Sequence, residues 1–252
     1  MPSSPTLIRE VVVNERAAMS FDCWQDLPFF HGLTPDSLNR IAQVAHRRQY
    51  QAGATIFTEG DRCSGFYIVL DGLVRIFRVS AEGRLHTLSL LRAVSSFNEV
   101  AAVDGGLNPF NAMAVTATDV MVISHDWLLS LMSSERVLLA NYVQGLAHMN
   151  REYIERLEDM TFRTIPSRLA KLFLHETTYG DQINEAPTKL TQEEIASILG
   201  TTREVVGRAL RGLLNAGLLR KKGRAVYIAD REGLEYLART NMMPQTETEL
   251  QF

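Results

Sequence analysis

The sequence predicts an α+β fold with an N-terminal jelly-roll cassette (a double-stranded β-helix), a long helix and a C-terminal winged helix-turn-helix. Short β-rich runs separated by Gly and Asp from about 47 to 125 are typical of a jelly roll or barrel. Helical periodicity follows over 134–162, and a helix-turn-helix with a hairpin follows over 188–240. The expected boundaries are an arm at 1–26, the cassette at 27–133, the long helix at 134–164, the winged domain at 165–240 and a polar tail at 241–252.

Length and composition exclude several classes of protein. The 252 residues, of which 46% are hydrophobic and 22% charged, are typical of a globular chain with one or two domains. Cys23 and Cys63 are the only cysteines, so one chain cannot supply a four-thiolate metal site, and we expect no bound metal. No apolar run approaches the ~20 residues of a bilayer span, and no secretory signal is visible. We therefore expect a reduced, cytoplasmic location without membrane contact.

The cassette is expected to begin with a capped helix. Thr34 is a suitable N-cap, Pro35 suits the first helical position, and Asp36 lies in the first turn. Alternating apolar and basic residues over 73–78 then predict a half-buried strand, and 81–83 reads as a hairpin turn.

Apolar residues follow a 3-4-3-4-3 spacing along the long helix, with one polar member. The members of this seam are Val143, Leu146, Asn150, Tyr153, Leu157 and Met160. Packing against its own domain is the simpler explanation for an apolar helix face, but other residues can serve that purpose: Leu138, Leu139, Tyr142 and Ile154. The heptad seam therefore predicts a homodimer, in which Asn150 would favour one register.

The segment 188–228 has the pattern of a DNA-binding helix-turn-helix followed by a basic wing. Thr191 and Glu194 form a capping box at the first helix, and Gly200 marks the turn into the second, which Thr201 or Thr202 caps. The residues expected on the inner face of the two helices are Ile195, Leu199, Val205, Ala209 and Leu213. The first residues of a second helix meet base edges in the major groove. We expect direct base contacts from Arg203, Glu204 and Arg208, room for close approach at Gly207, and phosphate contacts from the wing residues Lys221, Lys222 and Arg224.

The distribution of charge agrees with double-stranded DNA as a partner. The whole chain carries a formal charge of −3. Residues 165–240 contain 12 basic and 9 acidic side chains, a balance of +3, so the rest of the chain carries −6. The basic surface is confined to the winged domain.

The stretch LTQEEIASILGTTREVVGRAL resembles the DNA-binding helices of the CRP/FNR family of bacterial transcription regulators, and the resemblance extends over about 27–240. In that family a Ser/Thr-Arg-Glu-x-x-Gly-Arg core reads TGTGA-like half-sites; Thr202, Arg203, Glu204 and Arg208 match it. Gln192, next to Thr191, matches a phosphate-contacting position. The resemblance implies a palindromic site, a dimer through the long helix, an effector-binding cassette, and RNA polymerase as a further partner.

The resemblance also locates an effector pocket, in which this chain departs from the cAMP-binding pattern. The segment Phe97-Asn98-Glu99-Val100 resembles the phosphate-binding segment, and Glu99 matches the glutamate that contacts ribose. Asn98 and Val94 stand where the family has glycine, and the arginine that neutralises the phosphate is missing, with Pro109, Phe110 and Asn111 at its place. Tyr153 matches one adenine-contacting position, but Ile154, at the other, cannot donate a hydrogen bond. We therefore expect that cAMP is not the effector.

Other effectors are constrained less tightly. An iron–sulfur cluster is rejected because it needs four cysteines. Haem stays an alternative, with His148 on the long helix the most interesting of the six histidines, His31, His46, His86, His125, His148 and His175. The remaining alternatives are an unidentified small molecule in an apolar pocket and no effector at all. A different function class, a ligand-binding cassette protein or a jelly-roll enzyme without a DNA role, would not need the 188–228 pattern, and the scattered histidines do not favour a metal enzyme.

Overall fold

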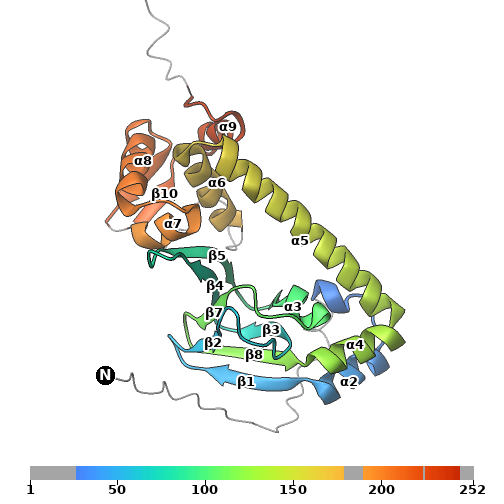
Figure 1. Ribbon diagram of the computed structural model, residues 1–252. Helices are drawn as coiled ribbons and strands as arrows, with labels where there is room; N and C mark the ends of the chain where they lie inside the picture. The colour runs from blue at the N-terminus through green and yellow to red at the C-terminus, as the bar shows by residue number, and fades with distance from the viewer. Residues whose placement is uncertain (1–26, 179–189, 224, 245–252) are drawn as a thin grey trace, which may run out of the picture. The chain divides into compact units, whose positions relative to one another are not determined.

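The computed structural model describes residues 27–178, 190–223 and 225–244, and the chain divides into two compact units, 1–152 and 153–252 (Figure 1). The predicted arm, Arg224 and most of the predicted tail lie outside the described residues.

The first unit contains two antiparallel four-stranded sheets in jelly-roll order, β1-β8-β3-β6 and β2-β7-β4-β5. The strands are β1 (His46–Tyr50), β2 (Thr55–Phe57), β3 (Phe66–Asp71), β4 (Val74–Val79), β5 (Leu85–Leu91), β6 (Ser95–Phe97), β7 (Asn111–Ala114) and β8 (Thr118–Ile123). Their inner faces share one buried cluster, to which Tyr67 and Val120 contribute from the first sheet and Val74 and Ala112 from the second. Each of these four side chains is fully buried, so the interior is packed as a core between two sheets. The predicted cassette fold is confirmed.

Helices flank the sheets of this unit. They are the 3-10 helix η1 (Pro28–Phe30), α2 (Pro35–Val44), α3 (Glu99–Asp104), α4 (His125–Ser134) and the start of α5 (Arg136–Phe162). Thr34 caps α2 as expected, because its hydroxyl accepts a hydrogen bond from Ser37 N at 3.2 Å. The long helix was expected to begin at residue 134. Instead, Ser134 ends α4 and an extended Glu135 separates it from α5.

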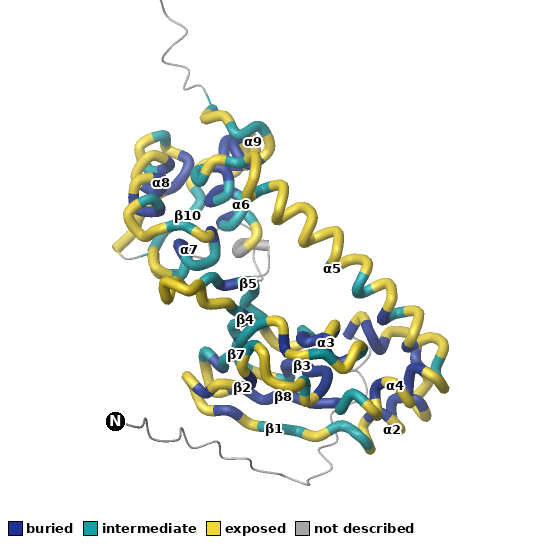
Figure 2. The backbone as a smooth tube through the Cα atoms, in the orientation of Figure 1, coloured by how far each residue is buried: buried dark blue, intermediate teal, exposed yellow. Residues whose placement is uncertain are grey.

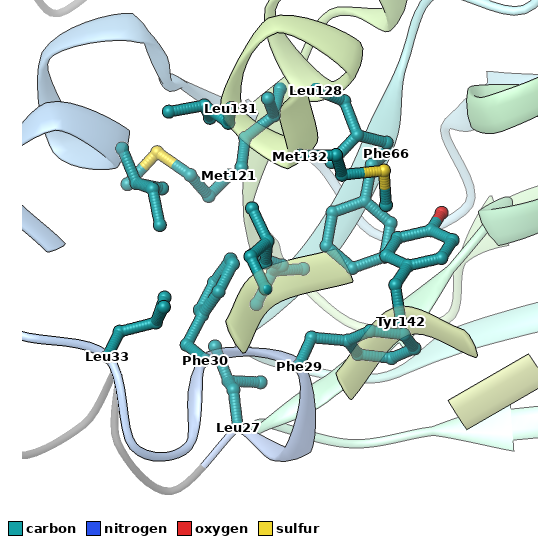
Figure 3. Close-up of a cluster of buried hydrophobic side chains, with 14 of the residues drawn as sticks. Leu27, Phe29, Phe30, Leu33, Phe66, Met121, Leu128, Leu131, Met132 and Tyr142 are labelled. Carbon is teal, nitrogen blue, oxygen red and sulfur yellow. The ribbon is translucent and has the colours of Figure 1, made fainter. Parts of the chain in front are cut away.

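A second apolar cluster binds these helices to the cassette (Figure 3). Phe29 contacts Phe66 and Tyr142 with ring centroids 5.3 and 4.9 Å apart, so η1, strand β3 and helix α5 meet at three aromatic rings. Asn141 of α5 also donates hydrogen bonds to the carbonyl oxygens of Phe29 and His31. A Cβ at position 145 would lie 2.7 Å from the Phe29 ring, which explains why α5 has Gly145 there.

The second unit is the predicted helix-turn-helix with its hairpin. Its elements are the end of α5, α6 (Ile165–Thr178), α7 (Gln192–Leu199), α8 (Arg203–Asn215), β9 (Leu219–Lys222), β10 (Ala225–Ile228) and α9 (Arg231–Thr240). Of the residues expected on the inner face, Ile195, Leu199, Ala209 and Leu213 are buried. Val205 is only half-buried, and its neighbour Val206 is fully buried instead. The prediction of a buried Val205 was therefore wrong, whereas Ala209 and Leu213, one and two turns further on, confirm the predicted face of α8.

The end of α5 is fixed to the winged domain by one carboxylate. Asp159 accepts hydrogen bonds from Arg163 Nε and from Lys171 Nζ of α6, both at 2.6 Å. Arg163 also donates to the carbonyl oxygen of Ala238 in α9. These contacts join the last turn of the long helix to two helices of the winged domain.

Candidate DNA interface and effector site

The first turn of α8 presents the three residues expected to read bases. The chain turns at Gly200, in the left-handed conformation that glycine tolerates (φ +61°), and Thr202 caps α8 through its hydroxyl. Arg203, Glu204 and Arg208 are all exposed. Neither arginine has a salt bridge or a side-chain hydrogen bond within the described residues, so both guanidinium groups can bind a ligand.

Glu204 is held as an anion. Its own backbone N–H at the start of the helix lowers the pKa of the carboxyl, and the Thr202 hydroxyl lowers it further. An ionised carboxylate is the form that accepts hydrogen bonds from a cytosine amino group.

The surfaces on either side of α8 carry the remaining expected contacts. Thr191 and Glu194 form the capping box, with Thr191 N donating to Glu194 Oε2 at 2.7 Å, and Gln192 is exposed. Lys221 and Lys222 are exposed on β9, and Arg224 lies outside the described residues. In the adjoining wing, Arg220 lies over the Tyr227 ring at 5.3 Å, which stiffens the hairpin.

Gly207 was expected on the DNA-facing side of α8, but its surroundings differ from that expectation. It is buried, and a Cβ at this position would lie 3.4 Å from Gln192 Oε1 and 3.6 Å from Arg211 Nη1. Both distances are ordinary van der Waals contacts with the ends of flexible side chains, so the packing of α7 on α8 does not require glycine here. The expected close approach of DNA at this position stays a prediction.

Most of helix α5 is exposed within the described residues (Figure 2), and apolar side chains are among the exposed ones. Val143, Tyr153, Leu157 and Met160 are 57%, 51%, 66% and 52% exposed, and Asn150 is also exposed. Leu146 differs, because it is half-buried against the cassette core.

The residues expected to pack α5 on its own domain differ in burial. Leu138 and Tyr142 are buried, but Leu139 and Ile154 are exposed. Packing on the cassette therefore accounts for the start of the helix and leaves most of the seam unexplained.

The effector segment is buried in the cassette. Phe97, Asn98 and Glu99 are at most 5% exposed. Asn98 Nδ2 donates to Asn108 Oδ1 at 3.0 Å, and it also lies 3.2 Å from Cys63 Sγ. Its Oδ1 is buried without a hydrogen-bond partner. These partners lie 10 to 35 residues away in sequence, and no local pattern indicates them.

Glu99 lies in an environment that disfavours charge. Burial raises the pKa of its carboxyl, and the Ser96 hydroxyl, which donates to Oε1 at 2.7 Å, opposes that shift only in part. The backbone oxygen of Glu99 accepts a hydrogen bond from Tyr142 of α5 at 2.8 Å. The effector segment is thus joined directly to the long helix.

Aromatic rings occupy the side of the cassette where a phosphate-binding arginine would be expected. Phe57 contacts Phe110 and Phe97 at 5.8 and 5.9 Å between ring centroids. Asn111 makes hydrogen bonds within the cassette, because its Oδ1 accepts from Glu59 N at 3.1 Å and its Nδ2 donates to the carbonyl oxygen of Phe77 at 3.4 Å. Its place in the effector pocket stays a prediction. Pro109 is exposed. Tyr153 belongs to the second unit, so its place at the pocket stays a prediction.

The histidines considered for haem have ordinary surroundings. His148 is exposed on α5 and lies 3.3 Å from Glu152, and His125 Nδ1 lies 2.8 Å from the carbonyl oxygen of Ala102. Across 27–178, 190–223 and 225–244, no group of three or more His, Cys, Asp or Glu could hold a metal ion.

Val94 and Asn98 adopt left-handed backbone conformations, with φ of +66° and +68°. The two positions are those at which the resembling pattern has glycine. A β-branched residue is strained there by roughly 1–2 kcal/mol. We expect Val94→Gly to raise the free energy of unfolding of the cassette by up to about 1 kcal/mol, after the entropic cost of glycine. Urea titration followed by tryptophan fluorescence measures this, since both tryptophans, Trp24 and Trp127, precede the second unit.

Val79→Gly is a matched control for this prediction. Val79 is 48% exposed, close to the 44% of Val94, and it lies in strand β4 without positive φ. This variant should lose about 0.5–1 kcal/mol. A Val94→Gly variant that loses stability as Val79→Gly does would show that no strain is stored in the loop.

The buried carboxyl of Glu99 predicts a pH-dependent stability. Its pKa in the folded state lies above that of the unfolded chain, so the favourable protonated form is lost as pH rises from about 4.3 through the folded pKa. Glu99→Gln keeps an acceptor for Ser96 and has no proton to lose. The variant should therefore gain stability relative to wild type as the pH is raised in urea titrations of the cassette. A stability difference that is the same at acidic and neutral pH would contradict the assignment.

The comparisons with known proteins agree with this geometry. Residues 47–135 match the family model of the cyclic nucleotide-binding domain, and residues 167–237 match that of the Crp-like helix-turn-helix domain. The CRP-like cAMP-activated global transcriptional regulator of Mycobacterium tuberculosis is 31% identical over 216 residues, which cover 83% of this chain and 96% of that protein. The chain belongs to the CRP/FNR family of transcription regulators.

Further members of the CRP/FNR family resemble it over a similar length. The cyclic AMP receptor protein of Thermus thermophilus is 30% identical over 212 residues, covering 84% of this chain and 96% of that protein. The crystal structure of a CRP/FNR-family transcriptional regulator, also from Thermus thermophilus, has a TM-score of 0.64 and 26% identity, and covers 78% of this chain and all of that one. This chain is thus a DNA-binding regulator with a cyclic nucleotide-binding-type cassette. Within the part of the chain that the structure describes, no helix is long and apolar enough to cross a bilayer.

Proposed function

We propose that this regulator binds a palindromic TGTGA-like site as a homodimer and that an effector other than cAMP acts on its cassette. The observation that carries the proposal is the first turn of α8, where Arg203, Glu204 and Arg208 are exposed on a capped helix. A bidentate arginine on guanine and a carboxylate on a cytosine amino group suit a GTGA element. Thr191, Gln192, Lys221 and Lys222 would hold the phosphates on either side.

The homodimer is supported by the exposed seam of α5. Val143, Asn150, Tyr153, Leu157 and Met160 share a heptad face. A two-fold axis along this helix would give each half of a palindrome one recognition helix, with half-sites one DNA turn, ~34 Å, apart. Where the protein activates transcription, RNA polymerase is a further partner.

The Mycobacterium tuberculosis relative is described as cAMP-activated and one Thermus thermophilus relative as a cyclic AMP receptor protein. The cassette of this chain differs at the residues that would bind the phosphate. No Arg or Lys lies between Glu99 and Arg136, and Phe110 contacts Phe57 in that region. A cyclic phosphate without a cationic partner would be costly to bury. We therefore propose an effector without a phosphate group. Haem is the alternative effector that is simplest to detect, because it would give a Soret band in the absorption spectrum of the purified protein.

Calorimetric titration of the full chain with cAMP tests the effector proposal. We expect no saturable heat and no change in DNA affinity. Saturable binding of cAMP that tightens DNA binding would overturn it.

A gel-shift assay with genomic fragments separates the DNA-binding function from the alternative of a cassette protein or enzyme without a DNA role. We expect a few fragments to be retained selectively and to share a palindromic TGTGA-like element. The Mycobacterium tuberculosis relative and the Thermus thermophilus crystal structure named above are described as transcriptional regulators, which also favours a role other than catalysis. Failure to retain any fragment would favour the alternative.

A further inference from the structure

An open pocket of about 360 Å³ lies within the winged domain, where it shares Gln192 and Lys221 with the proposed DNA interface. Its walls come from α6, α7, α8 and the wing. The apolar part of the lining, which we call the floor, consists of Phe173, Ile195 and Leu210, which are buried, and Leu214 and Val226, which are half-buried. A pocket of this size accommodates a small ligand with one ring or a short branched chain.

The rim of this pocket is basic and polar. Arg211 and Lys221 line it, and neither has a salt bridge or side-chain hydrogen bond within the described residues. Gln192 Oε1 and Arg211 Nη1 lie 3.4 and 3.6 Å from the same point, the position of a Cβ on Gly207. Two polar ends thus converge directly above the apolar floor.

No acidic side chain is among the described residues that line the pocket. The nearby carboxylate of Glu194 accepts hydrogen bonds from the N–H and hydroxyl of Thr191, which lines the rim. The described lining therefore has two cationic side chains, Arg211 and Lys221, and no anionic one to balance them. A bound anion could supply the missing negative charge.

We propose that this pocket binds a small amphiphilic carboxylate, with its aryl or branched alkyl group on the floor and its carboxylate between Arg211 and Lys221. Guanidinium binds a carboxylate in a bidentate, charge-assisted fashion, and the buried apolar faces supply the rest of the affinity.

A ligand in this pocket would weaken DNA binding by the winged domain. This consequence rests on the proposed DNA interface. Gln192 and Lys221 line the pocket and are also proposed phosphate contacts. A carboxylate at Lys221 would neutralise one phosphate-binding charge, so ligand and DNA would compete. The winged domain would then have an inhibitory input separate from the cassette.

Phenylacetate and its neutral amide, phenylacetamide, are suitable probes for calorimetry with the full chain and no DNA. Phenylacetate should bind saturably, and phenylacetamide should bind at least about tenfold more weakly because it lacks the charge. Arg211→Gln should weaken phenylacetate binding to a similar extent. Arg239→Gln is the matched control, since Arg239 is an exposed arginine of α9 that does not line the pocket.

The outcomes separate this inference from the proposed function. Absence of phenylacetate binding, or binding that Arg211→Gln leaves unchanged, would overturn the pocket assignment whether or not the protein binds DNA. Fluorescence anisotropy with a labelled operator should show phenylacetate weakening DNA binding by wild type and not by Arg211→Gln. Saturable ligand binding without any effect on DNA affinity would overturn the competition alone.

Discussion

Replacing Arg203 with alanine will weaken binding to a palindromic TGTGA-like duplex by about 1–3 kcal/mol for each half-site. The loss arises because Arg203 is exposed at the start of α8 and has no described salt bridge, so its guanidinium is free to make bidentate contact with guanine. Because a dimer would lose the contact in both half-sites, the combined loss is about 2–6 kcal/mol, roughly thirtyfold or more in affinity, if the two half-sites are independent. Fluorescence anisotropy with a labelled duplex measures it.

The same variant should also lose discrimination at one guanine of each half-site. Lys222→Ala is the informative comparison, since a phosphate contact should weaken binding to all sequences alike and lower the salt dependence. Arg239→Ala, on an exposed turn of α9, should leave affinity unchanged. If Arg203→Ala bound the palindrome as tightly and as selectively as wild type, Arg203 would not be a base-reading residue.

Leu157→Asp should convert the protein into a folded monomer. Leu157 is 66% exposed in the single chain, so the change costs the monomer little. In a heptad seam the two copies of this residue meet near the axis, and two unpaired carboxylates would then be buried side by side. We expect the dissociation constant of the dimer to rise at least about a hundredfold. Sedimentation velocity reports the oligomeric state, and affinity for the palindrome should fall with it.

His148→Asp is the control for that variant. His148 is exposed on the same helix but does not belong to the seam. A new carboxylate at this position should therefore leave the dimer intact. A Leu157→Asp protein that sediments as a dimer would place the interface elsewhere. Equal dissociation by both variants would show that the helix responds to charge in general.

Local signals in the sequence were sufficient for most of the fold. The capping boxes and caps at Thr34, Thr191 and Thr202 act within three residues, and the structure has each of them. The regular spacing of turn residues is also a local signal; it predicted a barrel or a jelly roll, and the structure has the two-sheet jelly roll. The prediction of a buried Val205 was wrong because adjacent valines occupy the start of α8, and an apolar pattern cannot tell which of two neighbouring valines lies deeper.

The candidate effector site could be predicted only in part. The positions of Glu99 and of the missing arginine follow from a linear segment. The partners of Asn98, the hydrogen bond from Tyr142 to Glu99 and the ring of Phe110 against Phe57 depend on chain segments that meet only in the folded cassette. The pocket beside Arg211 is likewise formed by residues of α6, α7, α8 and the wing, and no sequence motif predicts it.

The central claim, that a two-fold dimer reads two half-sites with two copies of α8, is tested most directly by changing the half-site spacing. Two duplexes are compared, one with the half-sites one helical turn apart and one with about 5 bp inserted between them, which rotates one half-site to the opposite face. The account predicts tight binding to the first duplex and only weak, salt-sensitive binding to the second, comparable with a single half-site. Equal affinity for both duplexes would contradict it.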